Sequence, residues 1–189
     1  MLELNFNPFP ELETERLKLE RVATVHAEAM FEMRSNDDVM RYIERPRPKS
    51  IEDIHVLIRR NNELIDANEA LIWFLRLKDT DKFCGNILLW QINKDNHRGE
   101  VGYLLHPDYW RKGIVTEAVQ EVLRYGFDEL KLHSIEANVN PKNEPSWKLL
   151  EKCGFVREAY FRENFYWGGK FHDTMIYSLL VQDWKKSRL

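Results

Sequence analysis

The clearest signal of a functional site in the sequence lies between positions 97 and 118. Arg111, Lys112 and Gly113 form a basic, glycine-containing turn directly before a helical pattern in which apolar residues recur four positions apart. The first N–H groups of a helix have no intrahelical partner and carry a partial positive charge, and glycine lets the backbone approach a phosphate closely. The turn is therefore a predicted anion-binding site.

A short apolar strand precedes this turn. Residues 100–105 alternate, so that Glu100, Gly102 and Leu104 share one face, and Pro107 ends the strand because proline cannot donate to a β-ladder. Many proteins contain a strand, a basic glycine turn and a helix in this order, so this combination alone is weak evidence for an anion site. The turn is neither a P-loop, which needs GxxxxGK followed by serine or threonine, nor a GxGxxG dinucleotide motif.

Two sequence blocks, in a fixed order, are much more specific than the glycine turn alone. EVGYLLHPDYWRKGIVTEA is followed by LHSIEANVNPKNEPSWKLLEKCGF. Together these blocks resemble the GNAT superfamily of N-acetyltransferases, and more narrowly its ribosomal-protein N-terminal (alanine and serine) acetyltransferase branch. The resemblance extends from about Thr14 to Trp184. It implies an enzyme that takes acetyl-CoA as cosubstrate and uses no metal.

The resemblance also implies where the cofactor phosphates bind. The family loop is written (Gln/Arg)-x-x-Gly-x-(Gly/Ala), and here only Gly113 matches strictly, because Trp110 and Val115 stand at its two ends. Tryptophan is common at the first position in the ribosomal-protein branch. The groups expected at the phosphates are the main-chain N–H groups and basic side chains of Arg111, Lys112, Gly113, Ile114, Val115 and Thr116. Solvated charges at a helix start are the alternative for the two basic residues.

Further implied roles complete the site. The backbone N–H groups of Tyr103, Leu104 and Leu105 are expected to bind the thioester carbonyl, as an oxyanion hole in which one donor contributes ~3 kcal/mol. Asn143 is expected to hydrogen-bond the pantetheine arm. Glu100 is the candidate general base, and a surface or substrate-orienting carboxylate is the alternative.

Ser146 has two interpretations. The resemblance makes it the candidate proton donor to the leaving thiolate. Its place before residues 147–152 also makes it a suitable helix N-cap. A serine hydroxyl is a poor acid, and a thiol with a pKa of about 8.5 leaves as thiolate with little help. The capping role is therefore favoured.

Hydrophobic periodicity predicts a mixed α/β (α+β) chain around these residues. The expected strands are 17–19, 71–77, 83–92, 100–105, 134–139, 155–167 and 170–181; the expected helices are 25–35, 51–68, 114–130 and 146–152. Thr24, Ser50 and Asn36 are the predicted N-caps, and Gly168-Gly169 is a predicted hairpin turn. The order fits a GNAT-like, mostly antiparallel twisted sheet flanked by helices, with splayed central strands and a C-terminal β-hairpin. One domain over 1–189 is expected, with an extended N-terminal arm at 1–13.

The composition narrows the function classes. Of the 189 residues, 43% are hydrophobic and 31% charged, and the net charge of -3 argues against a protein that coats nucleic acid. Cys84 and Cys153 have no CxxC partner, and the six histidines show no metal spacing. The start has no signal-peptide pattern and no stretch reaches the ~20 apolar residues of a membrane helix, so we expect a cytoplasmic protein without a membrane partner.

The acceptor is expected to be a peptide or protein N-terminal α-amine, and other partners stay open. A small amine (polyamine, amino sugar or amino acid) is one alternative. A CoA-binding module without turnover is another, supported by Val115. A third is an RNA-associated protein with stacking aromatics at Tyr160, Phe161, Phe165, Tyr166 and Trp167, although direct nucleic-acid binding is not expected and packing in the core or in an acceptor pocket is favoured. The oligomeric state, a homodimer included, stays open.

Overall fold

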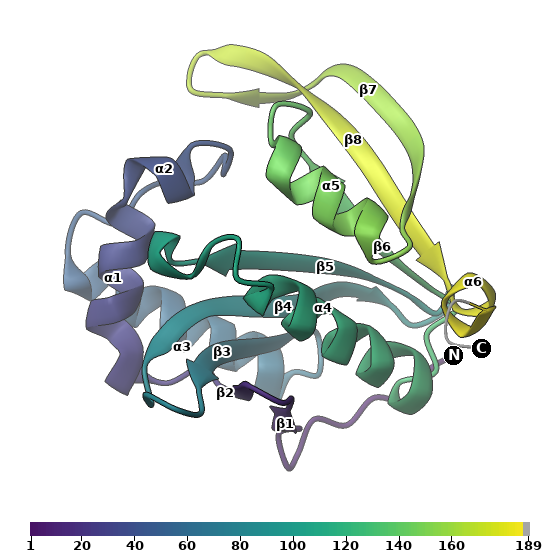
Figure 1. Ribbon diagram of the computed structural model, residues 1–189, viewed down its shortest axis with the longest axis horizontal. Helices are drawn as coiled ribbons and strands as arrows, with labels where there is room; N and C mark the ends of the chain where they lie inside the picture. The colour runs from purple at the N-terminus through teal and green to yellow at the C-terminus, as the bar shows by residue number, and fades with distance from the viewer. Residues whose placement is uncertain (187–189) are drawn as a thin grey trace.

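The computed structural model describes residues 1–186. A single eight-stranded sheet forms its centre, in the order β1-β2-β3-β4-β5-β6-β8-β7 (Figure 1). Within the described residues only β5 and β6 pair in parallel, and the other neighbours are antiparallel. The strands are β1 (Leu12–Glu13), β2 (Leu17–Arg21), β3 (Leu71–Leu77), β4 (Phe83–Asn93), β5 (Arg98–Leu105), β6 (Ser134–Val139), β7 (Val156–Trp167) and β8 (Lys170–Leu180).

Helices lie on both faces of this sheet, with α3 and α4 on opposite sides in Figure 1. They are α1 (Ala27–Ser35), α2 (Asp37–Met40), α3 (Ile51–Asp66), α4 (Ile114–Arg124), α5 (Glu144–Lys152) and α6 (Val181–Lys186). The expected sheet flanked by helices and closed by a C-terminal hairpin is confirmed. No described helix combines the length and the hydropathy needed to cross a membrane.

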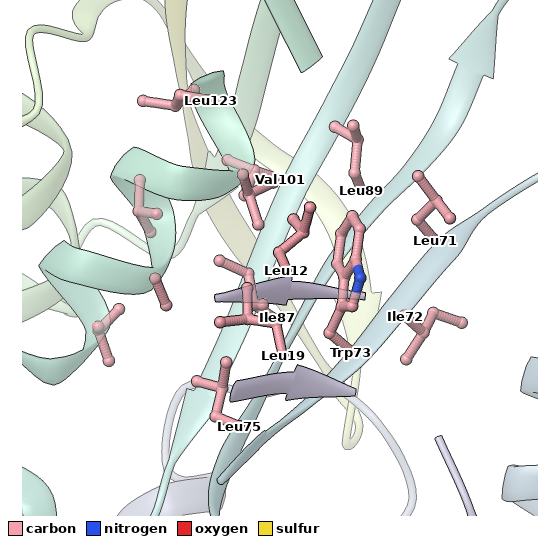
Figure 2. Packing of buried hydrophobic residues seen from close by; sticks show 14 of the residues in the cluster. Leu12, Leu19, Leu71, Ile72, Trp73, Leu75, Ile87, Leu89, Val101 and Leu123 are labelled. Carbon is pink, nitrogen blue, oxygen red and sulfur yellow. The ribbon is translucent and has the colours of Figure 1, made fainter. Parts of the chain in front are cut away.

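The main core lies between α4 and the central strands. Apolar residues recur four positions apart along one face of α4 and are buried in the core, among them Ala118 and Val122. Figure 2 shows Leu123 of α4 in the same cluster as Ile87 and Val101. A valine, leucine or isoleucine side chain contributes about 1.5–3 kcal/mol when it is fully buried. This packing fixes where the start of α4 stands relative to β5.

The two central strands separate soon after they meet. β5 pairs with β6 only from Arg98 opposite Ser134 to Glu100 opposite Glu136. Beyond Glu100, β5 continues to Leu105 and β6 to Val139 without pairing with each other. The expected splay is confirmed, and it leaves backbone groups of β5 without a strand partner on that side.

Several expected boundaries were wrong. Thr24 is not an N-cap but lies inside a 3-10 turn, Thr24–His26, that precedes α1. By contrast, the helix expected over 114–130 has nearly the expected extent, as α4 to Arg124 followed by a π-helical turn, Tyr125–Glu129. The last strand ends at Leu180, and α6 follows because this helix lets Trp184 pack on Phe127, with ring centroids 5.3 Å apart.

The N-terminal segment contacts the body of the protein over much of its length. Phe6 is buried, and its N–H donates to Asn68 Oδ1 at 2.6 Å. The indole of Trp73 donates to the carbonyl of Pro10 at 2.7 Å. Leu12 then enters β1, opposite Leu19, so this extended stretch adds an edge strand to the sheet.

Candidate active site

The start of α4 has the geometry of an anion site. Gly113 is the N-cap residue and has φ +75°, a conformation that strains other residues. No side chain caps this helix, and the first intrahelical hydrogen bond goes from Glu117 N–H to the Gly113 carbonyl at 3.1 Å. The N–H groups of Ile114, Val115 and Thr116 therefore stay free to bind an oxyanion.

The side chain of Val115 does not obstruct this site. Val115 is 9% exposed and Ile114 is 4% exposed, and both belong to the core under α4. Their side chains therefore point into the core, while their N–H groups lie at the helix start. Arg111 and Lys112 are exposed beside them. The departure from the family pattern at Val115 thus has no steric consequence for the loop.

Arg16 is a residue of this site that the sequence did not reveal. Its Nε lies 2.6 Å from Glu117 Oε2, and its Nη1 donates to the Lys112 carbonyl at 2.9 Å. A Cβ added at Gly113 would lie 3.4 Å from Arg16 Nη2. Thr14 also donates to the Glu117 carboxylate. The start of β2 is thereby joined to the loop, about 100 residues away in the chain, and a cation lies beside the predicted phosphate site.

The three backbone N–H groups of β5 that are expected to bind the thioester carbonyl do not all face the same side of the strand. The N–H of His106 donates to the Cys84 carbonyl at the start of β4, at 2.8 Å. Backbone groups two residues apart face the same side, so the N–H of Leu104 also faces β4. The N–H groups of Tyr103 and Leu105 therefore face the splay, where β5 has no strand partner. Leu104 contributes its side chain to the neighbouring cavity instead.

Ser146 is not the N-cap of its helix, so that prediction was wrong. Asn143 is the N-cap, and its Oδ1 accepts from the Ser146 N–H at 3.4 Å. Pro145 fits the first turn of a helix, so α5 begins two residues earlier than expected. Ser146 Oγ lies 2.9 Å from the hydroxyl of Tyr103, and burial raises the pKa of that phenol.

Glu100 is a buried carboxyl group at the point where β5 and β6 separate. It is 7% exposed, and its Oε2 accepts from Asn138 Nδ2 at 2.6 Å. Burial is the main cause that raises its pKa; Asn138, Trp90 and Arg45 act in the opposite direction, and Glu136 adds to the increase. A carboxylate with a raised pKa is a stronger base near neutral pH, which suits proton abstraction.

A cavity of about 1230 Å³ lies at the point where β5 and β6 separate, and several of the predicted site residues line it. It contacts Tyr103, Leu104, Asn143 and Ser146, which are predicted cofactor or catalytic residues, and also Glu100. It then extends to the loop between α2 and α3 (42–49) and to Phe165 and His172 of the hairpin. Leu105 and the loop residues Arg111, Lys112, Gly113, Ile114, Val115 and Thr116 are outside its lining.

The aromatic hairpin residues do not pack as expected. Tyr160, Phe161 and Tyr166 are exposed, and Phe165 is the member of the predicted set that lines the cavity. Core packing was therefore wrong for the three exposed rings, because β7 is the last strand of the sheet and most of its side chains face solvent. His172 Nδ1 lies 3.8 Å from Glu44 Oε1 across the cavity. Residues 1–186 hold no cluster of three side chains suited to a metal ion.

Comparisons with known proteins agree with this geometry. A family model described as Acetyltransferase (GNAT) domain matches residues 16–156. The chain is 36% identical over 172 residues to the uncharacterized N-acetyltransferase YoaA of Bacillus subtilis (strain 168), covering 91% of this chain and 97% of that protein. It is similar to the crystal structure of the acetyltransferase (GNAT family) from Bacillus anthracis, with TM-score 0.82 and 31% identity over 92% of this chain and 99% of that one. It is 30% identical over 92 residues to the ribosomal protein uS5-alanine N-acetyltransferase of Escherichia coli (strain K12), 49% of this chain and 47% of that protein.

Proposed function

The chain belongs to the GNAT acetyltransferase family and is an acetyl-CoA-dependent N-acetyltransferase, and on this premise we propose that its acceptor is the α-amine of a protein or peptide N-terminus. The observation that carries the proposal is the large cavity beside Glu100. Its walls are the loop between α2 and α3 on one side and the β7–β8 hairpin on the other. A volume of about 1230 Å³ exceeds the ~300–1,000 Å³ of ordinary small-ligand pockets, so it has room for several residues of a peptide as well as the cofactor arm.

The residues around the splay fit acetyl-CoA. The free N–H groups at the start of α4, with Arg16 and Lys112 beside them, suit the pyrophosphate and 3′-phosphate. The unpaired edge of β5 suits a pantetheine amide and the thioester carbonyl, which Tyr103 and Leu105 N–H groups are turned to meet. Acetyl-CoA supplies the acetyl thioester, and the chain supplies orientation and proton transfer.

Glu100 is the group that we assign to accept the proton of the attacking amine. It lines the cavity, is held by Asn138, and has a raised pKa. Ser146 forms a hydrogen bond with Tyr103, and we assign its hydroxyl to donate a proton to the leaving thiolate. Neither thiol is assigned a nucleophilic role, because burial raises the pKa of Cys153 to about 11 and that of Cys84 to about 12, which keeps both protonated.

The proposed acceptor matches a site with one carboxylate base. An α-amine has a pKa of about 7.7–8.0, against about 10.4 for lysine. Near neutral pH the α-amine is therefore partly deprotonated, whereas lysine would first lose a proton at a cost of about 3.4 kcal/mol more. The partial match to the ribosomal-protein acetyltransferase supports the same class of acceptor.

The test is a comparison of kcat/KM across four acceptor classes. These are short peptides with free N-termini, the same peptides N-blocked but carrying lysine, a polyamine and an amino sugar. We expect the free N-termini to be acetylated most efficiently. Preference for the blocked lysine peptides, or acetylation of a small amine alone, would contradict the proposal.

A further inference from the structure

The wall of the cavity contributed by α1 contains an arginine without an ion pair. Arg34, in the last turn of α1, lines the cavity and is half-buried. Among residues 1–186, no hydrogen bond or ion pair reaches its guanidinium group. A guanidinium group that is half-buried and has no ion pair is less well hydrated than one in open solvent, so an anion beside it would be bound favourably.

A second guanidinium group increases this imbalance. Arg45, in the loop between α2 and α3, also lines the cavity, and its one side-chain hydrogen bond among the described residues goes to the Glu44 carbonyl. Burial, and to a smaller extent the charge of Arg45, lowers the pKa of Arg34. Two cations that face one cavity repel each other, so an anion between them would be bound favourably.

None of the carboxylates of the same cavity forms an ion pair with Arg34 among the described residues, and each accepts hydrogen bonds from other groups. Glu44 accepts from Asn140 Nδ2 at 2.7 Å. Asp53 caps the start of α3 by accepting from two backbone N–H groups, at 2.7 and 3.3 Å. Asp173 accepts from the Tyr160 hydroxyl and from a backbone N–H, at 2.5 and 2.8 Å. Glu100 accepts from Asn138.

The basic wall and the candidate base face a common space. Arg34, Arg45 and Glu100 all line the same cavity, and the charge of Arg45 acts on both Arg34 and Glu100. A molecule that places its amine at Glu100 thus has a cationic wall within the same cavity. A polyamine would bring further positive charges to that wall and bind poorly, whereas an amine with a nearby anionic group would bind well.

We propose that the acceptor carries a carboxylate a few bonds from its reactive amine, and that Arg34 binds this carboxylate with Arg45 beside it. The inference rests on the proposed function, since it places the acceptor amine at Glu100. The carboxylate has two sources, an acidic side chain at the second or third position of a peptide or the α-carboxylate of a free amino acid. A planar guanidinium group suits either one, because it can donate two parallel hydrogen bonds to a carboxylate.

The experiment compares two C-terminally amidated peptides that differ only by aspartate or asparagine at the second position, together with free amino acids and a polyamine. The variants are Arg34→Gln, which removes the charge, Arg34→Lys, which keeps it, and the control Arg59→Gln, an exposed arginine of α3 outside the cavity. Thermal melting and acetyl-CoA affinity, measured for each variant, establish that the fold and cofactor site are intact.

We expect wild type to prefer the aspartate peptide about tenfold in kcat/KM, mainly through KM. Arg34→Gln should remove this preference without changing kcat or acetyl-CoA affinity, Arg34→Lys should restore part of it, and Arg59→Gln should leave it unchanged. Equal efficiency of wild type on both peptides, or an equal loss on both in Arg34→Gln, would overturn the inference. Acetylation of an acidic free amino acid but of no peptide, with the same dependence on Arg34, would overturn the peptide proposal and keep the role of Arg34.

Discussion

The proposed cofactor side and the proposed acceptor side of this site are built from different kinds of chemical group. On the proposed cofactor side the groups are mostly backbone: uncapped N–H groups at the start of α4 and the unpaired edge of β5. On the proposed acceptor side they are side chains, chiefly Glu100, Arg34 and Arg45, from three separate elements. In this proposal, backbone groups bind a part of the cofactor that is the same for every reaction, whereas side chains can change with the acceptor. The comparison predicts that substitutions on the two sides affect different kinetic constants.

The largest effect is expected at Gly113. Gly113→Asp adds bulk and negative charge beside the predicted phosphate site, in a loop whose φ is +75°. Binding of acetyl-CoA should fall by at least about 100-fold, as measured by calorimetric titration of the folded variant.

Gly168→Asp is the matched control, since Gly168 also has positive φ and its Cβ would meet open space. It should bind acetyl-CoA as wild type does. Wild-type affinity in Gly113→Asp would show that the phosphates bind elsewhere.

Glu100→Gln should affect turnover and not cofactor affinity. Because it removes the proton acceptor alone, kcat should fall by roughly 10²-fold. Glu136→Gln, one strand away and paired with Arg98, is the control and should retain activity. Unchanged kcat in Glu100→Gln would assign the base role to another group or to water.

The pH dependence of stability gives an independent check on Glu100. Burial raises its pKa in the folded state, so the folded state holds the proton more tightly than the unfolded chain does. Wild type therefore loses stability as the pH rises through that raised pKa, and Glu100→Gln does not. The melting temperature of the variant relative to wild type should be higher at pH 7 than at pH 4; an equal difference at both pH values would contradict the raised pKa.

Arg16→Ala sharpens the comparison on the cofactor side. It removes the contacts to the Lys112 carbonyl and to Glu117, which orient the loop, and a cation beside the phosphates. The KM for acetyl-CoA should rise about fivefold, with little change in the KM for the acceptor. Arg21→Ala, which breaks an ion pair between β2 and Asp66 of α3, is the control. An equal rise in both KM values would point to a general loss of structure.

The smallest expected effect is a difference in stability between variants of Asn143 and Ser146, which tests which of the two caps α5. Asn143→Ala removes the N-cap of α5 and should lower the free energy of unfolding by about 1 kcal/mol. Ser146→Ala removes a hydroxyl inside the helix and should cost less stability than that. Chemical denaturation of both variants measures the difference, and a larger loss in Ser146→Ala would restore its capping role.

The sequence predicted most of the helices and strands, and most of the residues that we propose for cofactor binding. Apolar periodicity marks α3, α4 and the strands because each must bury one face, and Gly113 marks the loop because its φ is accessible to glycine at little cost. These signals are local, so they can be recognised without knowing which segment each element packs against. Boundaries failed where a distant contact decided them, as at Trp184, or where two capping residues competed, as at Asn143 and Ser146.

Other features of the proposed site follow only from the tertiary structure. Arg34 is one of many arginines in the sequence, and only the packing of α1 beside the loop between α2 and α3 places it in the cavity wall, half-buried and without an ion pair among residues 1–186. The same holds for Arg16, which reaches a loop about 100 residues away, and for Glu100, whose raised pKa comes from burial at the splay. Burial and charge compensation depend on every element that closes around a group, and for these residues those elements are far apart in the chain.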